Sequence, residues 1–212
     1  MIGKFASKRK IAKNTLEVSF DMPNSFVFEA GQYIQLVLTD NLKHYFSVTN
    51  SPNERNTLRI ATRLSGSEFK NTLQSLTPAT EVRVNGPWGD FVLSRKVRSY
   101  FFVAGGIGIT PFISMLRYIR EEKLTYEIEL LYFGKNSESR IYADELKKLE
   151  KNNPNFKLIL NTTNTLSLIK KRKEGVLYYI AGPPGFVNQI VNTLHAQRID
   201  QKNIMTDSFT GY

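Results

Sequence analysis

The sequence predicts two domains: an antiparallel β-barrel followed by a doubly wound α/β domain with a mostly parallel sheet. Three observations favour this fold class. The length of 212 residues suits two compact domains of about 100 residues each. Short runs rich in β-branched and aromatic residues fill the first half, whereas apolar runs alternate with helical patterns in the second half. We therefore expect a barrel domain over residues 1–95 and an α/β domain over residues 97–212.

Turn signals separate the expected strands of the first domain. The segments AGQ, TDN, NSPNE and NGPWG punctuate the β-type runs, and such even spacing is typical of an antiparallel barrel. One segment departs from this pattern, because Phe69, Leu73 and Leu76 recur at helical spacing and Ser67 suits a helix N-cap. The pattern predicts strands over 15–20, 33–38, 45–49, 58–63 and 81–86, and a helix over 67–76.

The second domain alternates between strands and helices. Such alternation favours parallel strands joined by crossover helices. The expected strands cover residues 99–104, 126–133, 156–162, 176–181 and 203–209. The expected helices cover residues 111–122, 139–152, 166–173 and 185–197.

Composition excludes several classes of site. The chain contains no cysteine, so disulfides, thiolate-bound zinc, iron–sulfur ligands and a cysteine nucleophile are excluded. Its two histidines, His44 and His195, are far apart in the sequence, so we expect no metal site. We also expect no signal peptide and no transmembrane segment, because no long apolar run occurs, and therefore a cytoplasmic location.

The formal charge is +10, from 29 basic and 19 acidic residues. Scattered basic residues favour a solvated basic surface. The alternative interpretations are an acidic protein partner or a polyanionic ligand. Nucleic acid is less favoured, because no basic stripe is interleaved with aromatic residues in one segment.

A glycine-rich turn, AGGIGITP (104–111), joins the first strand of the second domain to a helix. In a parallel sheet this turn lies at the carboxyl end of the strand, where open α/β folds bind ligands. Gly105, Gly106 and Gly108 lack a Cβ, so a ligand can approach the backbone. Thr110 suits the N-cap and Pro111 the first helical position, which predicts an anion site at the helix N-terminus. The alternative is a tight strand–helix turn without a ligand.

A second turn has a similar design. AGPPGF (181–186) places Gly182, Pro183, Pro184 and Gly185 between a buried strand and a helix. Helix initiation alone accounts for one proline. Two such turns in one sheet favour a shared binding crevice.

Seven segments, in this order, resemble motifs of the ferredoxin–NADP reductase superfamily, flavin-dependent oxidoreductases with a flavin barrel and a nicotinamide-nucleotide domain. The resemblance covers nearly the whole chain. The segments are HYFSVTNSP (44–52), SEFKNTL (67–73), GPWGDF (86–91), AGGIGITP (104–111), YFGKNSESR (132–140), AGPPGF (181–186) and DSFTGY (207–212).

The resemblance implies an FAD-binding barrel, with FAD preferred over FMN, and a domain that binds NADP(H) or NAD(H). It implies an oxidoreductase that passes a hydride from NAD(P)H to flavin N5. The electrons would then pass to an acidic carrier of the ferredoxin or flavodoxin type, or to a small-molecule acceptor. No metal and no nucleic acid are implied.

The resemblance also assigns roles on the flavin side. Phe46 would pack against the isoalloxazine, and Ser47, a candidate catalytic residue, would hydrogen-bond near N5. Val48 and Thr49 would contact the ribityl chain through the backbone. The residues expected near the flavin pyrophosphate are Ser67, Phe69, Lys70 and Thr72.

On the nucleotide side the resemblance implies two groups of residues. Those expected to hold the nicotinamide nucleotide are Gly105, Gly106, Gly108, Thr110 and Pro111. Those expected to border or close the nicotinamide pocket are Gly182, Pro183, Asp207 and Phe209, with Asp207 as the second candidate catalytic residue. Lys135 and Arg140 would either bind a 2′-phosphate, which favours NADP(H), or be surface charges.

The sequence departs from the family pattern at two positions. His44 stands where the family usually has an arginine, so Lys43, Arg63 or Lys70 would supply the missing charge. Ala181 stands where a cysteine is common. These departures motivate an alternative hypothesis, a non-catalytic flavin- and nucleotide-binding electron-transfer subunit or redox sensor.

Overall fold

The computed structural model describes residues 1–212 except 135–139, 162–165, 171, 173 and 210–212. The chain divides into two compact units. The first comprises Met1–Leu93 and Thr110–Glu122, and the second comprises Ser94–Ile109 and Lys123–Tyr212. The expected domain boundaries remain a prediction.

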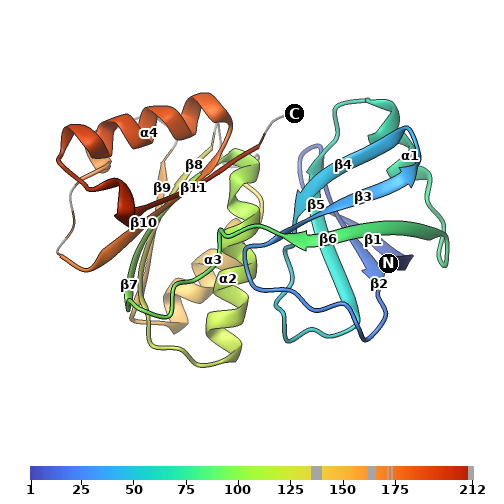
Figure 1. The fold of residues 1–212 in the computed structure, drawn as a ribbon, viewed down its shortest axis with the longest axis horizontal. Helices are drawn as coiled ribbons and strands as arrows, with labels where there is room; N and C mark the ends of the chain where they lie inside the picture. The colour runs from blue at the N-terminus through green and yellow to red at the C-terminus, as the bar shows by residue number, and fades with distance from the viewer. Residues whose placement is uncertain (135–139, 162–165, 171, 173, 210–212) are drawn as a thin grey trace. The chain divides into compact units, whose positions relative to one another are not determined.

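The first unit is built on a six-stranded antiparallel sheet in the order β4-β3-β6-β1-β2-β5 (Figure 1). Just after β4, the Thr49 N–H donates to the Arg59 carbonyl of β5 at 2.9 Å, which joins the two edges of the sheet into a barrel. The expected barrel is therefore confirmed. The elements are β1 (Ile2–Ala12), β2 (Thr15–Asp21), β3 (Tyr33–Thr39), β4 (Leu42–Ser47), β5 (Thr57–Arg63), α1 (Glu68–Ser75), β6 (Glu81–Trp88) and α2 (Thr110–Glu121).

Strand β1 was not expected from the sequence. Its segment IGKFASKRKIA carries four charged residues and few β-formers, so no alternating apolar pattern marks it. The strand forms because it pairs with β2 on one side and β6 on the other, while Phe5 fills the barrel. Pairing with two neighbouring strands therefore overrides the local propensity.

The barrel core follows from the alternation of side chains along each strand. Ile34 and Leu36 of β3 are fully buried, and so are Val18 and Phe20 of β2. Helix α1 adds Phe69 and Leu73 to the same core, which explains the helical spacing seen in the sequence. Burying each such side chain contributes about 1.5–3 kcal/mol.

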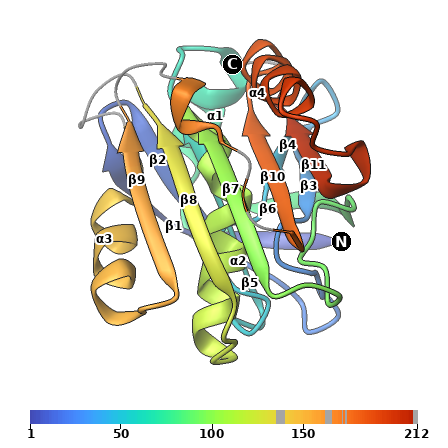
Figure 2. The ribbon, with the colours of Figure 1, turned by 90° about the vertical axis from the view of Figure 1, so that its left-hand side faces the viewer.

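The second unit is built on five parallel strands in the order β11-β10-β7-β8-β9, which lie side by side in Figure 2. This confirms the expected parallel sheet. The elements are β7 (Ser99–Gly105), the 3₁₀ turn η1 (Gly106–Ile109), β8 (Glu127–Phe133), α3 (Ala143–Asn152), β9 (Phe156–Asn161), η3 (Leu166–Leu168), β10 (Val176–Gly182), α4 (Pro184–Ala196), η4 (Gln201–Asn203) and β11 (Ile204–Ser208).

Helix α4 covers one face of this sheet. It packs Val187, Ile190 and Leu194 into a cluster with Val103 and Ile180.

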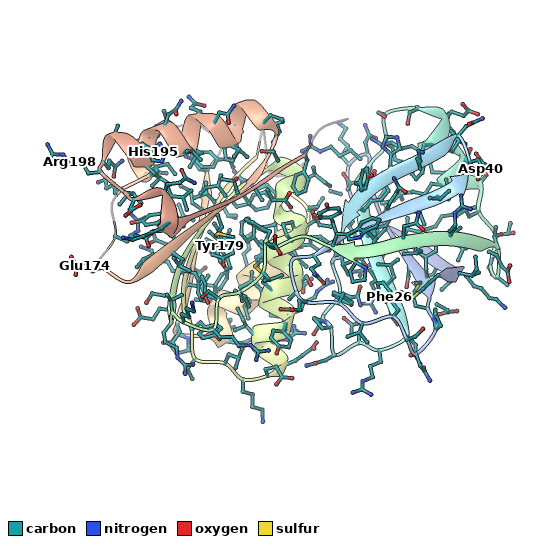
Figure 3. All side chains as sticks on the ribbon, in the orientation of Figure 1. Phe26, Asp40, Glu174, Tyr179, His195 and Arg198 are labelled. Carbon is teal, nitrogen blue, oxygen red and sulfur yellow. The ribbon has the colours of Figure 1, made fainter. Side chains whose placement is uncertain are left out.

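Tyr100 and Phe102 of β7 form an aromatic group with Tyr179 of β10. In it the Tyr100, Phe102 and Tyr179 ring centroids lie 5.6–5.7 Å apart. Figure 3 shows Tyr179 inside the unit, whereas Glu174, His195 and Arg198 point outward.

Two expected helices are shorter than the sequence pattern suggests. The helix expected over 139–152 begins at Ala143, because Tyr142 adopts a left-handed conformation with φ 59°. The helix expected over 166–173 is reduced to the 3₁₀ turn Leu166–Leu168, with residues 171 and 173 outside the described part.

Candidate functional site

Strand β4 places two side chains of the expected flavin motif on one face of the barrel. His44 and Phe46 are two residues apart, so they share a face, and both contact Phe69 of α1. Their ring centroids lie 4.6 Å and 5.8 Å from that of Phe69. Burial, and then the charge of Lys70, lowers the pKa of His44, so its imidazole is neutral at pH 7.

Lys70 is an unusual lysine, because only 5% of its surface is exposed. Within the described part of the chain it forms no ion pair, and the nearby cation that influences it is Arg63. Burial, and then the positive charge of Arg63, lowers the pKa of Lys70. A lysine with so little exposed surface, near a second cation and without an ion pair, is an arrangement that an anion would stabilise.

The end of β4 and the segment that follows it bury two hydroxyl groups without partners. Ser47 and Thr49 are 5% and 0% exposed. Neither Ser47 Oγ nor Thr49 Oγ1 has a hydrogen-bond partner, although the Thr49 N–H is paired with Arg59. Buried hydroxyls are normally hydrogen-bonded, so these two indicate a ligand that supplies polar atoms. Val48 between them is fully buried and donates its N–H to the Gln32 carbonyl.

Helix α1 begins directly beside Lys70. Ser67 occupies the N-cap position, as expected, but its side chain makes no capping hydrogen bond. The first N–H groups of the helix lie in this turn and are suited to an anion. Thr72 lies half-buried one turn further on.

In the second unit the two glycine turns pack against each other. A Cβ on Gly105 would lie 2.7 Å from the Phe186 ring, and one on Gly108 would lie 2.3 Å from the Ala181 carbonyl oxygen. A Cβ on Gly182 would lie 2.9 Å from the same Phe186 ring. Close packing against protein atoms therefore explains why a glycine occupies each of these three positions. The approach of a ligand at these positions remains a prediction.

At Gly106 the backbone conformation, and not close packing, explains the need for glycine. Its φ of 58° lies in the left-handed region, which glycine adopts without strain. The chain is helical from there on, because the 3₁₀ turn Gly106–Ile109 runs directly into α2 at Thr110. The N-cap role expected for Thr110 is therefore wrong, and Pro111 is the second residue of α2. Pro183 occupies the N-cap position of α4.

Asp207 lies on β11, beside Ala181 of β10. Its Oδ2 atom is buried without a hydrogen-bond partner, and burial raises the pKa of Asp207 to about 6. The following Phe209 N–H donates to the Gly182 carbonyl at 3.0 Å, so the end of the described chain is tied to the second glycine turn.

We expect the substitution Asp207→Asn to stabilise the second unit in a pH-dependent manner. The folded-state pKa of about 6 lies above the ordinary value of an aspartate, so ionisation destabilises the fold as the pH rises through about 6. The variant should match the parent below pH 4 and exceed its free energy of unfolding by about 3 kcal/mol at pH 8. Denaturant titrations across this range measure the difference, and a difference independent of pH would contradict the raised pKa.

Arg140 lies beyond the carboxyl end of β8, in contact with Gly134. Its Nε and Nη2 atoms are buried and have no hydrogen-bond partner. Buried guanidinium nitrogens without partners favour the interpretation that Arg140 binds an anionic ligand over the interpretation that it is a surface charge. Lys135, the other expected 2′-phosphate residue, lies outside the described residues.

The predicted flavin residues lie in the first unit, whereas the predicted nucleotide residues are divided, with Thr110 and Pro111 in the first unit and the three turn glycines in the second. The structure adds three residues that sequence reasoning missed, namely Asn50, Ser114 and Arg117. Asn50 accepts the Arg59 N–H at 2.7 Å and donates to the Thr57 carbonyl at 2.9 Å, which fixes the segment after β4. Ser114 and Arg117 could have been noticed in the sequence because they are polar residues within an otherwise apolar helix pattern.

Two domain models match the chain. An oxidoreductase FAD-binding domain matches residues 3–93, and an oxidoreductase NAD-binding domain matches residues 102–168. This chain belongs to the ferredoxin–NADP reductase superfamily. Among curated relatives, phthalate dioxygenase reductase of Burkholderia cepacia is 32% identical over 149 residues, covering 68% of this chain and 46% of that protein.

Two further comparisons agree with this family. Ferredoxin–NADP reductase B of Sorangium cellulosum is 31% identical over 153 residues, covering 69% of this chain and 63% of that protein. The solved structure of phthalate dioxygenase reductase superposes with a TM-score of 0.83 at 25% identity, covering 98% of this chain and 67% of that one. This family member spans about half the length of the first curated relatives, at 46%, 49% and 57%.

The FAD-binding domain contains groups that fit FAD. A pyrophosphate would compensate the buried charge of Lys70, and polar atoms of the flavin would satisfy Ser47 and Thr49. In the part of the chain that the structure describes, no cluster of acidic residues and histidines is suited to a metal. Among the described helices, none is both long and apolar enough to cross a membrane.

Proposed function

We propose that this chain is a flavin-dependent NAD(P)H reductase that delivers electrons to a separate acceptor. The observations that carry the proposal lie within the FAD-binding domain: Lys70 is buried without an ion pair among the described residues, and the buried hydroxyls of Ser47 and Thr49 have no hydrogen-bond partner. When bound, FAD supplies the ring that accepts a hydride from NAD(P)H and releases electrons singly or in pairs. The protein contributes binding, orientation and electrostatics.

On the flavin side, the residues bind the charged pyrophosphate and position the flavin ring. Lys70 and Arg63 bind the pyrophosphate together with the first N–H groups of α1. Ser47 donates its hydroxyl near flavin N5, and Phe46 packs against the ring. Thr49 holds the ribityl chain. These roles follow the family resemblance, and the unpaired polar atoms support them.

On the nucleotide side, the turn Gly106–Ile109 offers its N–H groups to the pyrophosphate of NAD(P)H. Gly182 and Pro183 border the nicotinamide, and Phe209 is held beside them by its bond to Gly182. Asp207 retains a proton at slightly acidic pH because its carboxyl is buried, so it can present an O–H donor in that range.

We infer that the acceptor is an acidic one-electron carrier protein with an iron–sulfur cluster. The chain has a formal charge of +10, which steers an acidic partner by long-range attraction. The chain contains no cysteine, so such a cluster belongs to another polypeptide or to a segment outside this sequence. The structure of phthalate dioxygenase reductase is described as modular for electron transfer from pyridine nucleotides to [2Fe-2S].

The test is anaerobic reduction. The purified chain is loaded with FAD, its absorption spectrum is recorded, and NADPH or NADH is added without oxygen. Bleaching of the flavin band supports the reductase, whereas bound FAD that neither coenzyme reduces supports the non-catalytic alternative. Stopped-flow mixing of the reduced protein with a ferredoxin, a flavodoxin, ferric chelate or quinone then identifies the acceptor class.

We expect Arg140→Ser to weaken the use of NADPH selectively. Only NADPH carries the 2′-phosphate that would pair with the buried guanidinium. The KM for NADPH should rise about tenfold while that for NADH changes little, since a charge-assisted hydrogen bond contributes about 1.5–3 kcal/mol. Steady-state kinetics with both coenzymes measure this, with the exposed Arg120→Ser as the control. An equal change for both coenzymes would show that Arg140 is structural.

A further inference from the structure

Helix α2 is hydrogen-bonded to residues 48–50 of the flavin motif, which we call the flavin segment. Ser114 Oγ donates to the Asn50 carbonyl at 2.7 Å, and Arg117 Nη1 donates to the Thr49 carbonyl at 2.8 Å. The two donors are three residues apart, so they lie on one face of the helix. Ser114, Thr49 and Asn50 are fully buried, and Arg117 is 7% exposed.

These bonds complete a set that fixes this short segment on every side. The Val48 and Thr49 N–H groups donate to Gln32 and Arg59 of neighbouring segments. The Asn50 side chain bridges Thr57 and Arg59. Ser114 and Arg117 then donate to the Asn50 and Thr49 carbonyls. The backbone is therefore held in one conformation while the Thr49 and Ser47 hydroxyls stay unpaired.

The arginine is embedded in a charge network of its own. Its Nη2 atom lies 4.0 Å from Glu17 Oε2, and Glu17 is 4% exposed. Arg9 pairs with the same carboxylate at 2.7 Å. The Glu17 charge offsets the desolvation of Arg117, so the guanidinium can reach the Thr49 carbonyl without being an isolated buried charge.

We propose that Ser114 and Arg117 are positioning residues for the flavin, which they orient through the backbone of Thr49 and Asn50. The chain enters α2 directly from the glycine turn Gly106–Ile109, so one helix follows the nucleotide turn and holds the flavin segment. The inference rests on the proposed function, because it assumes that FAD binds beside Ser47 and Thr49.

The serine gives the cleaner test, because its removal leaves no buried charge. We expect Ser114→Ala to weaken FAD binding about fivefold, the effect of one lost hydrogen bond. It should also change the visible circular dichroism and the midpoint potential of the bound flavin. Ser114→Thr keeps the hydroxyl and should restore the parent values.

The matched control is Ile119→Val, which removes one buried methylene from the same helix without touching a hydrogen bond to the flavin segment. It should lower the thermal midpoint but leave the FAD dissociation constant, dichroism and potential unchanged. If Ser114→Ala and Ile119→Val shift the flavin signals alike, the serine only stabilises the fold and the inference is wrong.

Arg117→Lys provides a second variant. It keeps a positive charge near Glu17, but a single ammonium does not reproduce the forked contact with Glu17 and Thr49. We expect the same spectral change as for Ser114→Ala. Unchanged spectra in both variants, with FAD bound, would overturn the inference and leave the reductase intact. Parent protein that takes up no FAD would instead overturn the proposed function.

Discussion

The substitution Gly108→Ala should disrupt the second unit and abolish nucleotide binding. Its Cβ would lie 2.3 Å from the Ala181 carbonyl oxygen, 2.5 Å from its carbon and 2.7 Å from the Gly182 Cα. All three atoms belong to the backbone of the neighbouring strand, so no side-chain rotation relieves the clash. We expect a loss of about 3 kcal/mol in the free energy of unfolding. The turn Gly106–Ile109 would move away from β10, and NADP⁺ affinity would fall with it.

Denaturant unfolding and calorimetric titration with NADP⁺ measure these effects. Gly185→Ala is the matched control, since it lies in the second turn and a Cβ there meets nothing within 4 Å. This control lies in the first turn of α4, where alanine is a better helix former than glycine, so stability should stay equal or rise slightly. Equal behaviour of the two variants would show that the packing of the turns is not the reason for Gly108.

The substitution Lys70→Met should change FAD affinity and apoprotein stability in opposite directions. The Lys70 side chain is buried and forms no ion pair with the described residues, and burial lowers its pKa, which means that the fold disfavours the charged form. Methionine removes this penalty, so the apoprotein should become more stable at pH 7. The same change removes the charge that would bind the pyrophosphate. We expect FAD to bind about 10- to 100-fold more weakly, the loss of one charge-assisted contact.

Thermal unfolding of the apoprotein and fluorescence titration with FAD give the two measurements. Lys43→Met is the control, because Lys43 is exposed on β4 one residue before His44 and therefore on the opposite face. The control distinguishes the cations that could replace the family arginine. If Lys43→Met weakens FAD binding and Lys70→Met does not, then the assignment of Lys70 to the pyrophosphate is wrong.

The order of elements could be predicted because it depends on local periodicity. Runs such as SYFFVA and PFISML show their strand and helix character without reference to the rest of the chain. The predicted parallel sheet and barrel are observed for this reason. The charged strand β1 escaped prediction because only its pairing with β2 and β6 makes it a strand.

The candidate site was predicted through motifs, which give residue types but not their environment. The motif marked Gly105 and Gly108 as ligand-facing, whereas the structure shows that protein atoms already occupy the space beside them. Similarly, Lys43, Arg63 and Lys70 were equal candidates for the missing charge. Burial then distinguished Lys70, because desolvation depends on neighbours from distant parts of the sequence.

By itself, the sequence determined the fold class, the family and the position of both glycine turns along the chain. The tertiary structure alone decided which polar groups are buried without partners, and that Ser114 and Arg117 reach the flavin segment. The physical reason is the range of the interactions. Periodicity and turn chemistry act between residues close in sequence, whereas burial, charge compensation and close backbone contact arise between residues that folding brings together.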